Sequence, residues 1–146
     1  MKKFTRKIIL IFAGILIVLQ VVKSEKSYEE VNPQTDFLSV LKAPKEVARI
    51  VKVNCYDCHS RQVKYPWYAS VAPISFVIEH HVEEGIEHLD FSDWTKYGPK
   101  KAAHKLEEIV EEVEEGKMPL KSYALLHGEL SEEDEKVFLN WVQTLR

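Results

Sequence analysis

The sequence predicts an all-α fold, and two observations support this prediction. Four stretches place their apolar residues at helical spacing, and over no useful length do apolar and polar residues alternate as in a β-strand. A length of 146 residues leaves room for one domain and a short targeting element. The hydrophobic share of 45% and the charged share of 29% are those of an ordinary globular protein. We therefore expect about four helices around one core.

The first 23 residues have the pattern of an export segment. Four basic residues, Lys2, Lys3, Arg6 and Lys7, come first, and a nearly unbroken apolar run over 8–22 follows them. This run suits a secretory signal or a short membrane-anchor helix, and the absence of a clear cleavage motif after it favours the anchor. The positive charges predict that the rest of the chain lies outside the cytoplasm, on the periplasmic side of the inner membrane.

The residues that follow divide into a tether and a domain. The sequence is polar from Lys23 to Thr35 and contains Asn32-Pro33, which is typical of a linker. We assign 1–23 to the signal or anchor, 24–43 to the tether and 44–146 to the domain. Folded structure should begin near Phe37 or Pro44.

Four helices are expected in the domain. The first begins near Pro44, and its apolar face carries Val47, Ile50 and Val51. The second begins near Pro73, ends at Gly85 and aligns Ile74, Val77, Ile78 and His81.

The third and fourth helices also have clear boundaries. The third runs from Pro99 to Gly116, with apolar Ala102, Leu106, Ile109, Val110 and Val113. The fourth is capped by Ser131 and directs inward Val137, Phe138, Trp141, Val142 and Leu145.

The only two cysteines form the pattern C-x-x-C-H with Cys55, Cys58 and His59. Residues three apart on a helical turn lie on one side, so both thiols can reach the two vinyl groups on one edge of a porphyrin. The adjacent histidine then lies beneath the iron, for which a neutral imidazole is a good ligand. The motif predicts one covalently bound haem c.

Three other kinds of site share part of this motif. A thioredoxin-like dithiol requires a neighbouring βαβ pattern, which the sequence lacks. A disulfide across so short a loop would stabilise the fold little. A zinc site requires four ligands, and no second Cys/His pair at ligand spacing completes the set.

The second axial ligand is predicted to be Met118, with His81 as the alternative. Met118 lies in Gly116-Lys117-Met118-Pro119, just after the third helix, where a loop can carry its thioether to the face opposite His59. His81 lies on the apolar stripe of the second helix, where a hydrogen-bonded core histidine is the commoner case. Ligation by methionine and histidine raises the reduction potential of haem.

Aromatic residues cluster after the motif, at Tyr65, Trp67 and Tyr68 around Pro66. They could line the haem edge or simply pack in the core. Trp94 and Trp141 are expected in the core.

These stretches resemble the haem-binding domain family of exported bacterial proteins, which is similar to class I cytochrome c. The resemblance rests on CYDCHS (55–60), YPWY (65–68), His81-Val82 with Gly85, Phe91-Ser92 with Trp94, GKMPL (116–120), and Ser122-Tyr123 with His127. It implies haem binding by Cys55, Cys58 and His59, with Met118 as second ligand. Arg61 stands where relatives are expected to have asparagine, and Phe76 where tryptophan is common.

Charge points to the kind of partner. Without the four N-terminal positive charges, 16 basic side chains face 23 acidic ones, a net charge of −7. This balance argues against nucleic acid and favours a basic redox partner protein.

The favoured function is that of a one-electron carrier rather than an enzyme. The alternative is a haem peroxidase or a sensor of gas or redox state, with an open distal site and His81 or His127 as acid/base. A third possibility is a non-redox module holding zinc or a disulfide.

Overall fold

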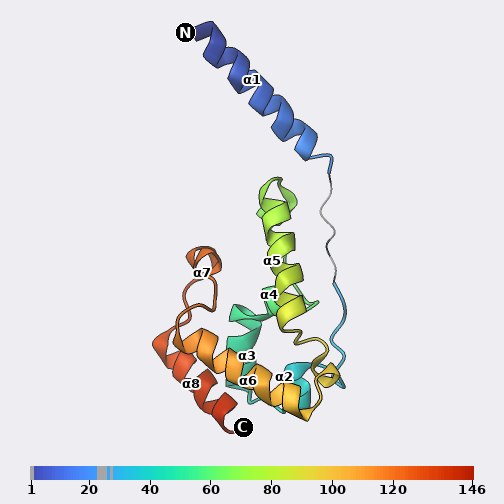
Figure 1. Ribbon diagram of the computed structural model, residues 1–146, viewed down its shortest axis with the longest axis vertical. Helices are drawn as coiled ribbons and strands as arrows, with labels where there is room; N and C mark the ends of the chain where they lie inside the picture. The colour runs from blue at the N-terminus through green and yellow to red at the C-terminus, as the bar shows by residue number, and fades with distance from the viewer. Residues whose placement is uncertain (1, 23–25, 27) are drawn as a thin grey trace.

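The computed structural model describes residues 2–22, 26 and 28–146, and this part of the chain is helical without any strand (Figure 1). The all-α prediction is therefore confirmed. The helices are α1 (Lys2–Leu19), α2 (Phe37–Val40), α3 (Lys45–Asn54), α4 (Tyr56–His59), α5 (Ile74–His88), α6 (Pro99–Glu114), α7 (Lys121–His127) and α8 (Glu132–Gln143). Two 3₁₀ turns, η1 (Trp67–Ser70) and η2 (Trp94–Lys96), lie between them.

The core lies between α3, α6 and α8, which gather with α2 at one end of the molecule (Figure 1). The predicted inward faces of these three long helices are confirmed, since their apolar residues are buried or pack against the buried cluster. Phe37 lies among the aromatic residues of this cluster, with ring centroids 4.4 Å from Phe91, 4.7 Å from Trp94 and 5.7 Å from Trp141. Both tryptophans thus belong to the core, as expected.

Buried structure begins at Asp36 and Phe37 rather than at Pro44. Asp36, Phe37 and Leu38 are all buried, so residues 36–43, which the sequence assigned to the tether, pack with the domain. Asp36 caps α2 by accepting hydrogen bonds from the amide and hydroxyl of Ser39. Its other carboxylate oxygen accepts a 2.8 Å bond from the hydroxyl of Tyr56, which lies between the two cysteines. The cap of α2 is therefore fastened directly to the cysteine motif.

Replacing Tyr56 with phenylalanine should destabilise the domain, because it leaves one oxygen of the buried Asp36 carboxylate without its donor. We expect a loss of about 1.5–3 kcal/mol in the free energy of unfolding, as for hydrogen bonds to charged groups. Urea unfolding, monitored by circular dichroism, measures this loss in the free energy of unfolding. Tyr28→Phe, at an exposed tyrosine, is the matched control. Equal stability of the two variants would contradict the prediction.

The second predicted helix is longer than expected. Gly85 was predicted to end it, but α5 continues to His88. A Cβ added at Gly85 would lie 2.3 Å from the carbonyl oxygen of Cys58, so this residue is glycine because α4 packs directly on it. The glycine marks a close approach of two backbones, and the prediction of a helix end there was wrong.

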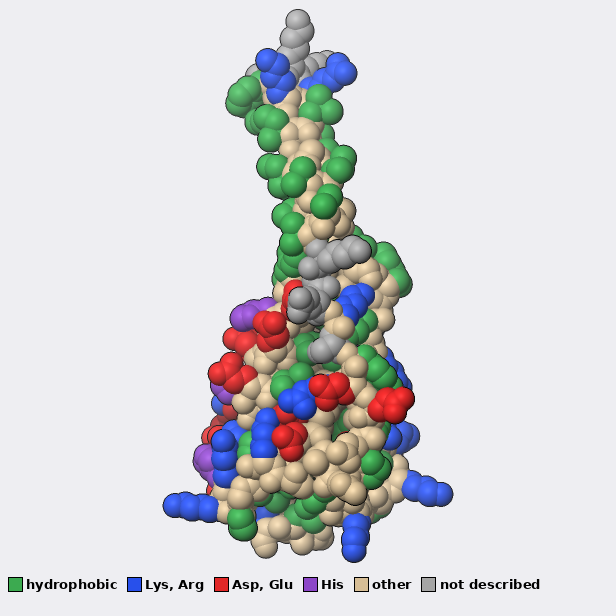
Figure 2. All heavy atoms as spheres, turned by 90° about the vertical axis from the view of Figure 1, so that its right-hand side faces the viewer, with side chains coloured by type: hydrophobic (Ala, Val, Ile, Leu, Met, Phe, Trp, Pro, Cys, Tyr) green, Lys and Arg blue, Asp and Glu red, His purple; other side chains and the backbone are tan. Residues whose placement is uncertain are grey.

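The N-terminal segment forms α1, whose apolar side chains are exposed along its length, with basic residues towards its outer end (Figure 2). Among the helices that the structure describes, none combines the length and apolar character needed to cross a membrane. The anchor prediction therefore gains no support from this helix.

Candidate haem site

The cysteine motif begins at Cys55, between α3 and α4, and its other residues form α4 itself. Cys55 follows the last residue of α3, and its carbonyl accepts hydrogen bonds from the amides of Cys58 (3.2 Å) and His59 (2.9 Å). The predicted helical turn is therefore present, and it brings Cys55 and Cys58 to one side of the backbone. Both residues are partly buried free thiols.

His59 is held in one orientation by the backbone of α5. Its Nδ1 lies 2.9 Å from the carbonyl oxygen of Gly85 and 3.0 Å from that of Leu89. Carbonyl oxygens only accept, so Nδ1 carries the proton and Nε2 keeps a lone pair. Burial lowers the pKa of His59, which favours the neutral imidazole. A neutral, oriented imidazole with a free Nε2 is the form that binds iron.

The thiols are not activated nucleophiles. Burial raises the pKa of Cys55 to about 12, and the nearby Cys58 adds to this shift. Burial likewise raises the pKa of Cys58 to about 11, and the neighbouring Asp57 adds to that shift. A catalytic dithiol has a lowered thiol pKa instead. Within the described residues, moreover, no group of three or more His, Cys, Asp or Glu side chains is placed to hold a metal ion. Neither the thioredoxin-like nor the zinc interpretation gains support.

Large apolar side chains are exposed on the elements around the motif. They are Val53 in α3, Trp67 in η1, Ile74 and Val77 in α5, and Leu125 and Leu126 in α7. These side chains supply apolar surface on the elements that adjoin the motif. A porphyrin is a large apolar ligand, so the donor set and its surroundings both fit haem.

The two candidates for the second ligand lie on different elements. Met118 is half-buried between α6 and α7, and it packs against the same core cluster as Cys55. His81 is half-buried on α5, one turn before Gly85 and therefore on the face of α5 that meets α4. Met118 as ligand, with His81 as the alternative, stays a prediction.

The aromatic residues after the motif have unequal burial. Tyr65 is half-buried, with the ammonium group of Lys26 5.2 Å from its ring centroid. Trp67 is 81% exposed and makes an edge contact with Tyr68. Packing in the core therefore does not explain Trp67, and a place at the haem edge stays a prediction for both Tyr65 and Trp67.

Sequence reasoning missed the role of Asp90, which supports the His59 side of the site. Asp90 is fully buried next to Leu89, and its carboxylate lies 3.1 Å from the Arg61 guanidinium and 2.9 Å from the Lys96 ammonium group. The same carboxylate accepts from the amides of Ser92 and Asp93. These bonds fix the loop whose Leu89 carbonyl orients His59. Arg61, noted as a departure from the family pattern, thus has a structural partner.

The sequence marks Tyr123 only as part of the family pattern, yet its side chain contacts the motif directly. Its hydroxyl lies 2.8 Å from the Val53 carbonyl oxygen and 2.9 Å from a carboxylate oxygen of Asp57. Burial and the neighbouring Asp57 carboxylate raise the pKa of Tyr123, which keeps the hydroxyl protonated as a donor. The spacing of the residues gave no signal for this contact, because 66 positions separate the two side chains.

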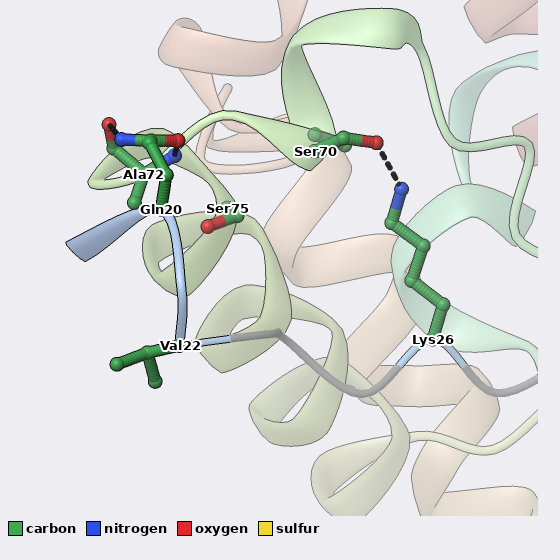
Figure 3. A pocket seen from close by; sticks show the side chains of 7 residues that line it. Gln20, Val22, Lys26, Ser70, Ala72 and Ser75 are labelled. Carbon is green, nitrogen blue, oxygen red and sulfur yellow. Dashed lines mark hydrogen bonds between the residues drawn. The ribbon is translucent and has the colours of Figure 1, made fainter. Parts of the chain in front are cut away.

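A surface pocket lies elsewhere, between the end of the N-terminal segment and the start of α5 (Figure 3). Gln20 exchanges two 3.0 Å hydrogen bonds with the backbone of Ala72 there, and Lys26 donates to the hydroxyl of Ser70. No residue of the cysteine motif lines this pocket.

Comparison with known proteins supports haem binding by this chain. Neither the curated proteins nor the solved structures gave a match to this chain. The family model of the haem-binding domain matches residues 14–144, which are most of the chain. The chain therefore belongs to the haem-binding domain family.

Proposed function

We propose that the chain carries one c-type haem on Cys55 and Cys58, with His59 as an axial ligand, and serves as a one-electron carrier. The orientation of His59 is the observation that carries this proposal. Two backbone carbonyls hold its Nδ1 proton, so Nε2 is the nitrogen available to iron. When bound, haem supplies a one-electron iron couple.

The neutral thiols suit the attachment chemistry. In forming each thioether, an S–H group adds across a vinyl C=C bond, so that sulfur bonds to one carbon and hydrogen to the other. This addition needs no net oxidant. The Cys55 and Cys58 side chains would hold the ring, and the turn that joins them would place His59 beside it as a ligand to iron.

The contacts of His127 favour the carrier over the peroxidase or sensor alternative. Its Nδ1 lies 3.2 Å from the Tyr123 carbonyl oxygen, and its Nε2 lies 3.3 Å from the Tyr68 hydroxyl. Both ring nitrogens have partners, so His127 would have to give up a hydrogen bond before it could exchange a proton with a bound peroxide.

Export and membrane attachment belong to the same proposal. The basic residues at the start of α1 and its exposed apolar side chains support an export segment that places the domain on the periplasmic side of the inner membrane. Cell fractionation with alkaline extraction would distinguish an attached chain from a cleaved one. Recovery of the uncleaved chain in the cytosol would refute export.

The partner proposed for electron exchange is a basic protein. The net charge of −7 on the chain beyond its first basic cluster supports this choice. Association that does not weaken as salt rises would contradict an electrostatic docking.

The test is to produce the full chain together with a c-type haem maturation system and to assay covalent haem as the pyridine haemochrome. One haem per chain, retained after denaturation, is expected. Absence of covalent haem would refute the proposal.

Met118→Ala tests the second ligand. If the Met118 sulfur binds iron, the oxidised protein has a weak near-infrared sulfur-to-iron band, and the variant loses it completely while its reduction potential falls. His81→Ala is the matched comparison and should keep the band. The opposite result, an unchanged Met118→Ala spectrum and a changed His81→Ala spectrum, would assign the ligand to His81.

A further inference from the structure

The helix α7 is attached to the rest of the domain mainly through polar contacts. None of its seven residues is fully buried, and Leu125 and Leu126 are 85% and 65% exposed. Apolar packing therefore contributes little to its position. Specific contacts from its side chains must hold it in place.

Tyr123 provides the principal contact. Its hydroxyl lies within donating distance of the Val53 carbonyl oxygen at 2.8 Å and of the Asp57 carboxylate at 2.9 Å. Asp57 lies between the two cysteines, and Val53 lies two residues before Cys55. Tyr123 thus joins α7 to the segment that carries the haem-attachment residues.

The acceptor of this bond is itself fixed. The second carboxylate oxygen of Asp57 accepts a 3.0 Å hydrogen bond from the backbone amide of Lys64. The carboxylate is therefore held between the loop after the motif and the hydroxyl of Tyr123. A donor to a fixed, charged acceptor makes one of the stronger kinds of hydrogen bond.

A second contact joins α7 to η1. The ring of His127 stacks on that of Tyr123, with centroids 4.1 Å apart and planes 11° from parallel. The His127 Nε2 lies 3.3 Å from the hydroxyl of Tyr68. Through Val53 in α3 and Tyr68 in η1, α7 is therefore linked to elements that precede and follow the motif in the chain.

The segment that carries Met118 lies between two anchored points. The amide of Met118 donates a 3.0 Å bond to the carbonyl of Glu112 in α6, and α7 begins three residues later at Lys121. Residues 118–123 are therefore held by α6 at one end and by Tyr123 at the other. Loss of the Tyr123 contact would release one end.

We propose that Tyr123 is a positioning residue, which fastens α7 to Asp57 and so holds the Met118 segment over the haem face opposite His59. This inference rests on the proposed haem attachment. It assigns no contact between Tyr123 and iron. The Tyr123 hydroxyl sets how often the Met118 segment moves away from the haem and lets an external ligand reach the iron.

The experiment compares Tyr123→Phe with the parent chain, both carrying haem. The phenyl ring keeps the stack with His127 and removes only the hydroxyl. Carbon monoxide binding to the reduced protein and the reduction potential are measured. We expect carbon monoxide to bind about ten times faster in Tyr123→Phe, which corresponds to about 1.4 kcal/mol, and the potential to fall.

Two further variants separate positioning from a general loss of stability. Tyr68→Phe removes the weaker contact and should give a smaller acceleration in the same direction. Tyr28→Phe, at an exposed tyrosine far along the chain from α7, should match the parent. Thermal unfolding of each haem-loaded variant shows whether the global fold has changed.

The outcomes are distinct. If the parent chain takes up no covalent haem, the proposed function fails. If it takes up haem but Tyr123→Phe binds carbon monoxide at the parent rate with an unchanged potential, the positioning role of Tyr123 is refuted while the function stands. If Tyr28→Phe accelerates binding equally, the effect is not specific to the Asp57 contact and the inference also fails.

Discussion

The double variant Cys55→Ser/Cys58→Ser is expected to lose covalent haem completely. Serine is close to cysteine in size, so the turn and the carbonyl contacts of His59 should persist, while no thioether can form. After denaturation and extraction with acidic solvent, the haem of the parent chain stays with the protein and that of the variant is removed. A haem stain on a denaturing gel and the pyridine haemochrome assay measure the difference.

The single variants refine this result. Cys55→Ser and Cys58→Ser each leave one thiol, so each should retain covalent haem through one bond. One vinyl group then stays conjugated with the ring, and the haemochrome band should move to longer wavelength in both. Covalent haem that survives in the double variant would contradict attachment at these positions, since the sequence has no other cysteine.

The long helices could be predicted because each carries a repeated signal. The apolar residues of α3, α6 and α8 recur at helical spacing, and Ser131 caps α8 by accepting from the amide of Asp134, as the sequence indicated. Cys55, Cys58 and His59 could be proposed as site residues for a related reason. The motif is local, and a single turn of backbone brings its members together.

What the sequence could not reveal depends on contacts between distant segments. The helix α7 has only seven residues and buries none of them, so it has no apolar period to detect. The Asp57–Tyr123 and Asp36–Tyr56 bonds join residues 66 and 20 positions apart. Gly85 was misread because a glycine near a helix end and a glycine at a close helix contact look the same in sequence.

Gly85→Ala is expected to have the largest effect on stability among single substitutions in α5. The added Cβ would lie 2.3 Å from the Cys58 carbonyl oxygen and 2.9 Å from its carbonyl carbon. Both are backbone atoms, so no side-chain rotation relieves the overlap and α5 must move away from α4. Overpacking costs about 1–3 kcal/mol, and we expect the upper end of that range here.

Gly14→Ala is the matched control, because Gly14 also lies inside a helix but has no atom near its added Cβ. Alanine favours an unobstructed helix by about 0.5–1 kcal/mol, so Gly14→Ala should not destabilise the chain. Chemical unfolding of the haem-loaded proteins compares the two. Opposite effects of the same chemical change would isolate the contact with Cys58 as the cause.

Gly85→Ala should lower haem uptake as well as stability, because the shift of α5 also disturbs His59. The Gly85 carbonyl is one of the two acceptors that hold Nδ1 of His59, so moving α5 away lengthens this bond as well as opening the contact with Cys58. We expect less covalent haem per chain in Gly85→Ala than in Gly14→Ala. Normal haem content and stability in Gly85→Ala would mean that α4 and α5 can separate without cost. In that case the Gly85 contact could not be what orients His59.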